Sequence, residues 1–159
     1  MDIGIRADGM TTSDFENFAI EIVKKKFDNS SLHGFKEGRD DGIDGIDDIA
    51  SPSLVIQAKR WQVTKNRATA VKLLKEEIDK IALTKEKYGW KNDFNYVIVT
   101  SMGLSPANLK EIRDYADTII PNAIPTDDYI IFSSTLTTLS QHKEYSEIFI
   151  KYGLLEKDI

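Results

Sequence analysis

The chain has 159 residues, of which 41% are hydrophobic and 30% charged, with a formal net charge of −5; these values are typical of a single globular domain with its own hydrophobic core. It contains no signal peptide and no apolar run long enough to cross a bilayer, so we expect neither export nor a membrane span. It also contains no cysteine, which excludes disulfides and cysteine-ligated zinc and favours a cytoplasmic location.

The first predicted element is a helix that begins near Ser13. Ser13 and Glu16 have the spacing of a capping box, in which the glutamate side chain reaches back to the first free N–H of the helix. Apolar residues then recur at helical spacing, at Phe15, Phe18, Ala19, Ile22, Val23 and Phe27.

A β-hairpin is predicted next. Two segments rich in β-branched residues, 43–49 and 54–59, are separated by a tight turn at residues 51–53, and residues 35–37 form a short strand before them. Side chains alternate along a strand, so Gln57 and Lys59 share one face. Four acids around the hairpin are predicted as turn and solvated rim residues, namely Asp40, Asp41, Asp47 and Asp48.

The rest of the chain alternates helices and strands. A helix with the apolar stripe Val71, Leu74, Ile78 and Ile81 ends near Gly89, where glycine is a natural stop. The later predicted elements are a buried strand at 95–100, a helix opening at Ser105 and Pro106, a strand at 129–132, a loop at 133–139 and a helix from His142. The strand, helix and strand over 95–132 predict a parallel crossover.

The chemistry concentrates at one end of the hairpin. Hard cations such as Mg²⁺ prefer oxygen ligands, and these are offered by the Asp44 carboxylate, the Gln57 side-chain carbonyl and the Ala58 backbone carbonyl. Lys59 would either stabilise the charge that develops on a phosphate or help to deprotonate the attacking water. The grouping suits a metal-dependent site that cleaves phosphodiester bonds.

The segments G-x-D-x-G-x-D-G, at 38–45, and V-x-Q-x-K-R-W, at 55–61, resemble the catalytic core of Mrr-type restriction endonucleases in the PD-(D/E)XK nuclease superfamily. The resemblance implies a three-layer α-β-α fold with a central mixed sheet. It also implies that Asp44 binds the metal, that Gln57 is a second ligand in place of the commoner acid, and that Lys59 is the catalytic lysine. Phe15-Glu16 matches a Phe-Glu pair whose acid faces the metal, so Glu16 is both a candidate helix cap and a candidate metal-site acid.

The same resemblance implies a Mg²⁺-dependent endonuclease, with Mn²⁺ as a possible substitute, that cleaves double-stranded DNA in a bacterial restriction or antiviral defence system. We expect one nuclease domain over 1–159, with its core at 13–135 and a helical extension at 138–159. We further expect it to be the N-terminal part of a longer protein that forms homo-oligomers through its other regions. The alternative is a catalytically weak nucleic-acid-binding or assembly module on the same fold, with Gln57 marking a weakened metal site.

Charge is distributed unevenly along the chain. Residues 59–91 hold ten Lys and Arg residues against four acids, a net charge of +6, so the remainder carries −5 − 6 = −11. This segment is either a surface that follows DNA phosphates or the solvated face of an amphipathic helix. The first interpretation makes Arg60, Lys65 and Arg67 candidate DNA-binding residues.

Overall fold

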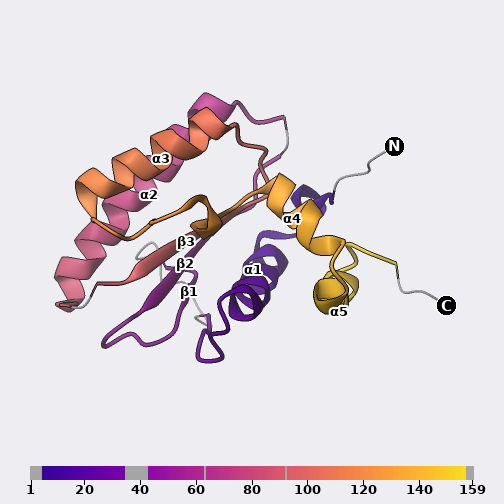
Figure 1. Cartoon of the computed structure of the whole chain (residues 1–159), viewed down its shortest axis with the longest axis horizontal. Helices are drawn as coiled ribbons and strands as arrows, with labels where there is room; N and C mark the ends of the chain where they lie inside the picture. The colour runs from indigo at the N-terminus through magenta and orange to yellow at the C-terminus, as the bar shows by residue number, and fades with distance from the viewer. Residues whose placement is uncertain (1–4, 35–42, 63, 92, 157–159) are drawn as a thin grey trace.

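The computed structural model describes residues 5–34, 43–62, 64–91 and 93–156. The helices and strands in chain order are η1 (Ala7–Gly9), α1 (Thr12–Lys26), β1 (Gly45–Ile46), β2 (Leu54–Lys59), α2 (Arg67–Tyr88), β3 (Asn95–Thr100), α3 (Pro106–Ile119), η2 (Asp127–Tyr129), β4 (Ile130–Ile131), α4 (Ser133–Ser140), η3 (Lys143–Tyr145) and α5 (Ser146–Lys151). In Figure 1 the sheet lies between α2 and α3 on one side and α1, α4 and α5 on the other. No helix within the described ranges is long and apolar enough to cross a bilayer.

The four strands form one mixed sheet in the order β1-β2-β3-β4. β1 and β2 are antiparallel, with Gly45 opposite Ile56, whereas β2–β3 and β3–β4 are parallel. The predicted hairpin and the predicted parallel crossover are therefore confirmed, as is the three-layer α-β-α fold with a mixed sheet. The predicted strand at 35–37 lies outside the described residues, as do Asp40 and Asp41.

Each face of the sheet is covered by its own hydrophobic core. Val55 of β2 packs into the core shared with α2 and α3, whereas Ile56 and Ala58 pack into the core shared with α1, α4 and α5. Side chains alternate along a strand, so Gln57 and Lys59 lie on the same face as Val55. This alternation directs the two polar side chains of β2 toward the α2 layer.

The helices of the α2 layer end where the sequence predicts. Gly89 stops α2 in the left-handed conformation, with φ of 67°, which glycine adopts without steric cost. Ser105 caps α3 by accepting a hydrogen bond from the Asn108 N–H, and Pro106 occupies the first turn. The strand predicted at 129–132 is shorter than expected, since only Ile130–Ile131 pairs with β3.

The predicted loop at 133–139 is wrong, because these residues form α4. Serine and threonine are weak helix formers, but packing of an apolar face routinely overrides such propensities. Here Leu136 is buried in the core of the α1 layer, and Leu139 packs against the same core. The Thr137 hydroxyl also accepts a hydrogen bond from the Ile5 N–H at 3.2 Å, which joins α4 to the N-terminal segment.

The connection between β1 and β2 is longer than the predicted tight turn at 51–53. Asp47 organises it: one carboxylate oxygen accepts hydrogen bonds from the backbone N–H groups of Ser53, at 3.0 Å, and Leu54, at 3.2 Å. The other accepts from the Asn29 amide at 3.2 Å and from the Ser53 hydroxyl. Asp47 and Asp48 are thus turn residues, as predicted.

Candidate active site

Asp44 lies next to β2, immediately before β1. The β1–β2 register pairs Gly45 with Ile56, and Asp44 comes immediately before this pair, beside β2. The Asp44 N–H donates to the Ile56 carbonyl at 2.8 Å, and its carboxylate accepts from the Ala58 N–H at 2.8 Å. These two bonds fix the carboxylate against the strand that carries Gln57 and Lys59.

The backbone of Ala58 faces the same edge. Backbone groups alternate in direction along a strand, and Ile56, two residues earlier, turns its carbonyl toward Asp44. The Ala58 carbonyl is therefore directed to the edge where the Asp44 carboxylate lies. The structure thus gathers three of the predicted oxygen donors on neighbouring positions.

Burial raises the pKa of Asp44 to about 6. The hydrogen bond from Ala58 opposes this rise, the negative charge of Glu16 adds to it, Lys59 opposes it, and Glu77 adds to it. A carboxyl group with this pKa is mostly charged at pH 7 and becomes protonated as the pH falls through about 6. A bound cation would favour the charged form.

Gln57 provides the observation that tests whether these residues fit a metal. Gln57 is only 3% exposed, and its side-chain carbonyl oxygen has no hydrogen-bond partner among the described residues. Leaving a buried acceptor unpaired costs about 1–3 kcal/mol. A divalent cation at the Asp44–Gln57 pair would satisfy this oxygen, so the donor set fits the predicted metal.

The described ranges contain no group of three or more His, Cys, Asp or Glu residues arranged to hold a metal ion. The candidate ligands are therefore of mixed type: one carboxylate, one amide oxygen and one backbone carbonyl, with Glu16 nearby. Mg²⁺ commonly binds through one or two carboxylates and keeps several waters. The mixed set is compatible with that mode of binding.

Glu16 belongs to the site's electrostatic environment and is not a helix cap. Thr11 caps α1, because its hydroxyl accepts a hydrogen bond from the Asp14 N–H at 3.0 Å, so Ser13 lies inside the first turn. The predicted capping box of Ser13 and Glu16 is wrong. Burial raises the pKa of Glu16 and the charge of Lys59 lowers it, so the half-buried Glu16 lies within electrostatic range of the site.

Lys59 has a partner that the sequence reasoning missed. Its ammonium nitrogen lies 3.3 Å from a carboxylate oxygen of Glu77, in α2, and its side chain is 29% exposed. Glu77 itself is 8% exposed. The signal was present in the sequence: Glu77 interrupts the apolar stripe of α2 between Leu74 and Ile78, where a charge is unwelcome.

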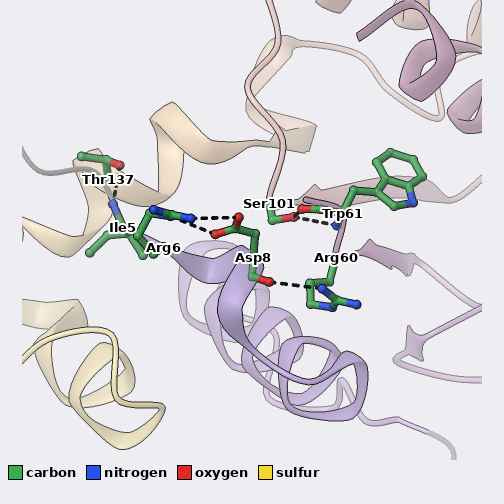
Figure 2. Close-up of polar contacts among 7 residues, drawn as sticks. All are labelled: Ile5, Arg6, Asp8, Arg60, Trp61, Ser101 and Thr137. Atoms are coloured by element: carbon green, nitrogen blue, oxygen red, sulfur yellow. Dashed lines mark hydrogen bonds and ion pairs between the residues drawn. The ribbon is translucent and has the colours of Figure 1, made fainter. Parts of the chain in front are cut away.

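The segment after Lys59 is attached to the rest of the fold at two points (Figure 2). The Arg60 guanidinium donates to the Asp8 backbone carbonyl at 3.1 Å. The Ser101 hydroxyl accepts from the Trp61 N–H at 2.7 Å and donates to the Trp61 carbonyl at 2.6 Å. Arg60, predicted to bind DNA, therefore has an intramolecular partner in η1.

The other two predicted DNA-binding residues lie nearby. The Lys65 ammonium nitrogen is 5.3 Å from the centre of the Trp61 ring, a cation–π distance. Arg67 is exposed at the first position of α2. Both lie between the end of β2 and the first residue of α2. The basic stretch from Arg60 to Arg67 therefore follows directly after Lys59.

Comparison with known proteins gives one match. The family model Mrr_cat, described as a restriction endonuclease, matches residues 7–119, a range that includes Glu16, Asp44, Gln57 and Lys59. No curated protein and no solved structure matches the chain. Because the matched range covers well over half of the chain, this protein belongs to the Mrr-type restriction endonuclease family and is a nuclease of the PD-(D/E)XK kind.

Proposed function

We propose that the chain is a Mg²⁺-dependent endonuclease that hydrolyses phosphodiester bonds of double-stranded DNA, with Asp44, Gln57 and Ala58 as metal ligands. The observation that carries this proposal is the buried side-chain oxygen of Gln57, which is unpaired among the described residues and lies one position before Ala58, whose N–H binds the Asp44 carboxylate. Membership of the restriction endonuclease family supports the reaction class and the DNA substrate. Mn²⁺, which accepts the same oxygen donors, would substitute for Mg²⁺.

Each side chain has a distinct role in this proposal. A bound divalent cation supplies Lewis acidity and a more acidic water. Asp44 and Gln57 hold the cation, and Glu16, on the far side of β2 in α1, orients water at the site. The Lys59 ammonium lies at the end of the same strand, where it stabilises negative charge on the scissile phosphate.

Phosphate contacts are proposed for the stretch from Arg60 to Arg67. Three lysines of the basic segment already form intramolecular ion pairs: Lys59 and Lys80 with Glu77, and Lys75 with Glu111. These pairs favour the solvated-helix interpretation for the middle of α2. At the start of the segment, we propose Lys65 and Arg67 as phosphate contacts, with Arg60 anchoring the stretch to η1.

We also propose that the biological substrate is foreign DNA, cleaved in a bacterial restriction or antiviral defence system. Restriction endonucleases are the family to which the chain belongs. The overall acidic charge of −5 would disfavour indiscriminate DNA binding.

Plasmid cleavage tests the proposed activity directly. Supercoiled plasmid is incubated with the protein in Mg²⁺, in Mn²⁺ and in EDTA, and open-circular and linear products are measured. We expect cleavage in both metals and none in EDTA. Cleavage that persists in EDTA would overturn the metal assignment, and tight DNA binding without cleavage would favour the alternative of a catalytically weak binding module.

A further inference from the structure

A buried acid in α2 faces the candidate active site. Glu77 lies on the face of the helix that packs against the sheet, beside the fully buried Leu74 and Ile78. One carboxylate oxygen lies 3.3 Å from Lys59 and 3.4 Å from Lys80, whereas the other is buried with no hydrogen-bond partner among the described residues. Such a half-satisfied acid lowers stability, so a purely structural role accounts for it poorly.

The charge of Glu77 reaches a second buried polar group, the hydroxyl of Tyr96. The hydroxyl of Tyr96, in β3, is buried and also unpaired in the described part of the chain. Burial raises the pKa of Tyr96, and the charges of Glu77 and then Asp44 raise it further. Glu77, Asp44 and Tyr96 therefore lie within electrostatic range of one another, and Tyr96 is buried in the core between the sheet and α2.

Lys59 needs such a partner in order to act at a defined place. A lysine side chain loses conformational entropy when it is fixed, and Lys59 is only partly covered, at 29% exposure. An ammonium group misplaced by about 1 Å loses much of its effect on a transition state. The ion pair to Glu77 restrains the side chain before substrate arrives.

We propose that Glu77 is a positioning residue that holds the Lys59 ammonium beside the metal ligands. The catalytic part of this inference rests on the proposed nuclease function, but the restraint on Lys59 does not. Glu77 acts only through Lys59 and touches neither metal nor DNA. Burying the Glu77 carboxylate with one oxygen unpaired lowers the stability of the fold, and this loss accompanies the restraint on Lys59.

Cleavage kinetics test the catalytic part. Glu77→Gln should lower kcat by roughly tenfold to a hundredfold, the range for a residue that orients a catalytic group, with KM unchanged. The thermal midpoint should stay constant or rise, because a half-paired buried charge is removed. The matched control is Glu76→Gln, an exposed acid one residue earlier in α2, which should cleave at the wild-type rate.

A double-mutant cycle separates action through Lys59 from an independent structural effect. In the Lys59→Met background, measured in single turnovers with enzyme in excess, Glu77→Gln should cause little further loss. An equal loss in both backgrounds would overturn the proposal. Full activity of Glu77→Gln would also overturn it. Glu77→Met, which keeps the volume without charge or amide, repeats the measurement if the Gln variant unfolds.

Proton–nitrogen correlation spectra of the lysine ammonium groups provide a readout that needs no activity. The Lys59 signal is assigned as the one absent from Lys59→Met. We expect it to shift or disappear in Glu77→Gln and to persist in Glu76→Gln. An unchanged Lys59 signal in Glu77→Gln would exclude the restraint, whatever the plasmid assay shows. Wild-type protein that fails to cleave but shows the expected spectra would refute the nuclease function alone.

Discussion

The two faces of the sheet hold their buried carboxylates in opposite ways. On the α1 side, Asp8 is 3% exposed, and both of its oxygens accept hydrogen bonds from Arg6, at 3.1 and 3.3 Å (Figure 2). On the α2 side, one oxygen of Glu77 has no partner among the residues described, and neither does the side-chain oxygen of Gln57 or the hydroxyl of Tyr96.

This difference in the pairing of buried polar groups distinguishes supporting residues from candidate site residues. Buried polar groups are normally paired, and exceptions concentrate at sites that bind or react. The Asp8 carboxylate on the α1 side follows this rule. On the α2 side, Gln57 and Glu77 break it beside Lys59, which supports our proposal that this side binds a ligand.

The largest expected effect comes from removing the Asp44 carboxylate, the proposed metal ligand. Asp44→Ala should reduce plasmid cleavage by roughly a thousandfold, the upper range for loss of one preorganised electrostatic group, and Lys59→Ala should act similarly. Far-ultraviolet circular dichroism should remain that of the wild type. Wild-type cleavage by a folded Asp44→Ala protein would remove the distinction between the two faces.

The opposite face should respond in stability. Phe18 is fully buried and packs edge-to-face against Phe149, with ring centres 5.4 Å apart. Phe18→Ala should cost about 3–5 kcal/mol of unfolding free energy in urea titrations, the usual range for a buried phenylalanine. Cleavage per folded molecule should be unchanged at a temperature where the variant is folded. A selective loss of cleavage would show that the α1 layer does more than support the sheet.

Glu16 tests where the α1 layer reaches the site. Because Thr11 caps the helix, Glu16→Gln should leave the thermal midpoint unchanged. Loss of its charge should reduce cleavage by roughly tenfold to a hundredfold, as for a group that orients the reacting water. The control is Glu21→Gln, an acid on α1 that hydrogen-bonds Lys151. A fully active Glu16→Gln would confine the site to the α2 side.

The smallest expected effect concerns acid stability through Asp47. Burial raises its pKa, but hydrogen bonds from Ser53, Asn29 and Leu54 outweigh it and hold the pKa below the ordinary value. A depressed pKa stabilises the fold above the unfolded-state value near 4, and this stability disappears as pH falls through the lower folded value. Asp47→Asn should therefore flatten the decline in stability as the pH falls below about 4.

At neutral pH the same Asp47→Asn substitution should cost about 1 kcal/mol, comparable to the loss of a helix cap. Urea titrations at several pH values measure both effects. The exposed Asp93 provides the control, since Asp93→Asn should leave the acid decline as it is. An unchanged pH dependence in Asp47→Asn would mean that the β1–β2 connection does not depend on this carboxylate.

Local patterns predicted much of the fold and part of the site. The alternation in residues 54–59 placed Gln57 and Lys59 on one face, and the β-branched runs identified the hairpin that brings Asp44 beside them. Glu77 was missed because its contact with Lys59 joins two elements across the core. The α4 helix was missed because Leu136 is stabilised by packing, and the role of Glu16 depended on how α1 docks, which sequence spacing does not fix.

The double hydrogen bond of Ser101 to Trp61 has a mechanical consequence. Because one hydroxyl ties down both the N–H and the carbonyl of Trp61, the backbone is clamped to the end of β3 two residues after Lys59. Hinge motion of the stretch that leads into α2 must therefore start beyond Trp61. The strand end that carries Lys59 is therefore held in place independently of the residues that follow Trp61.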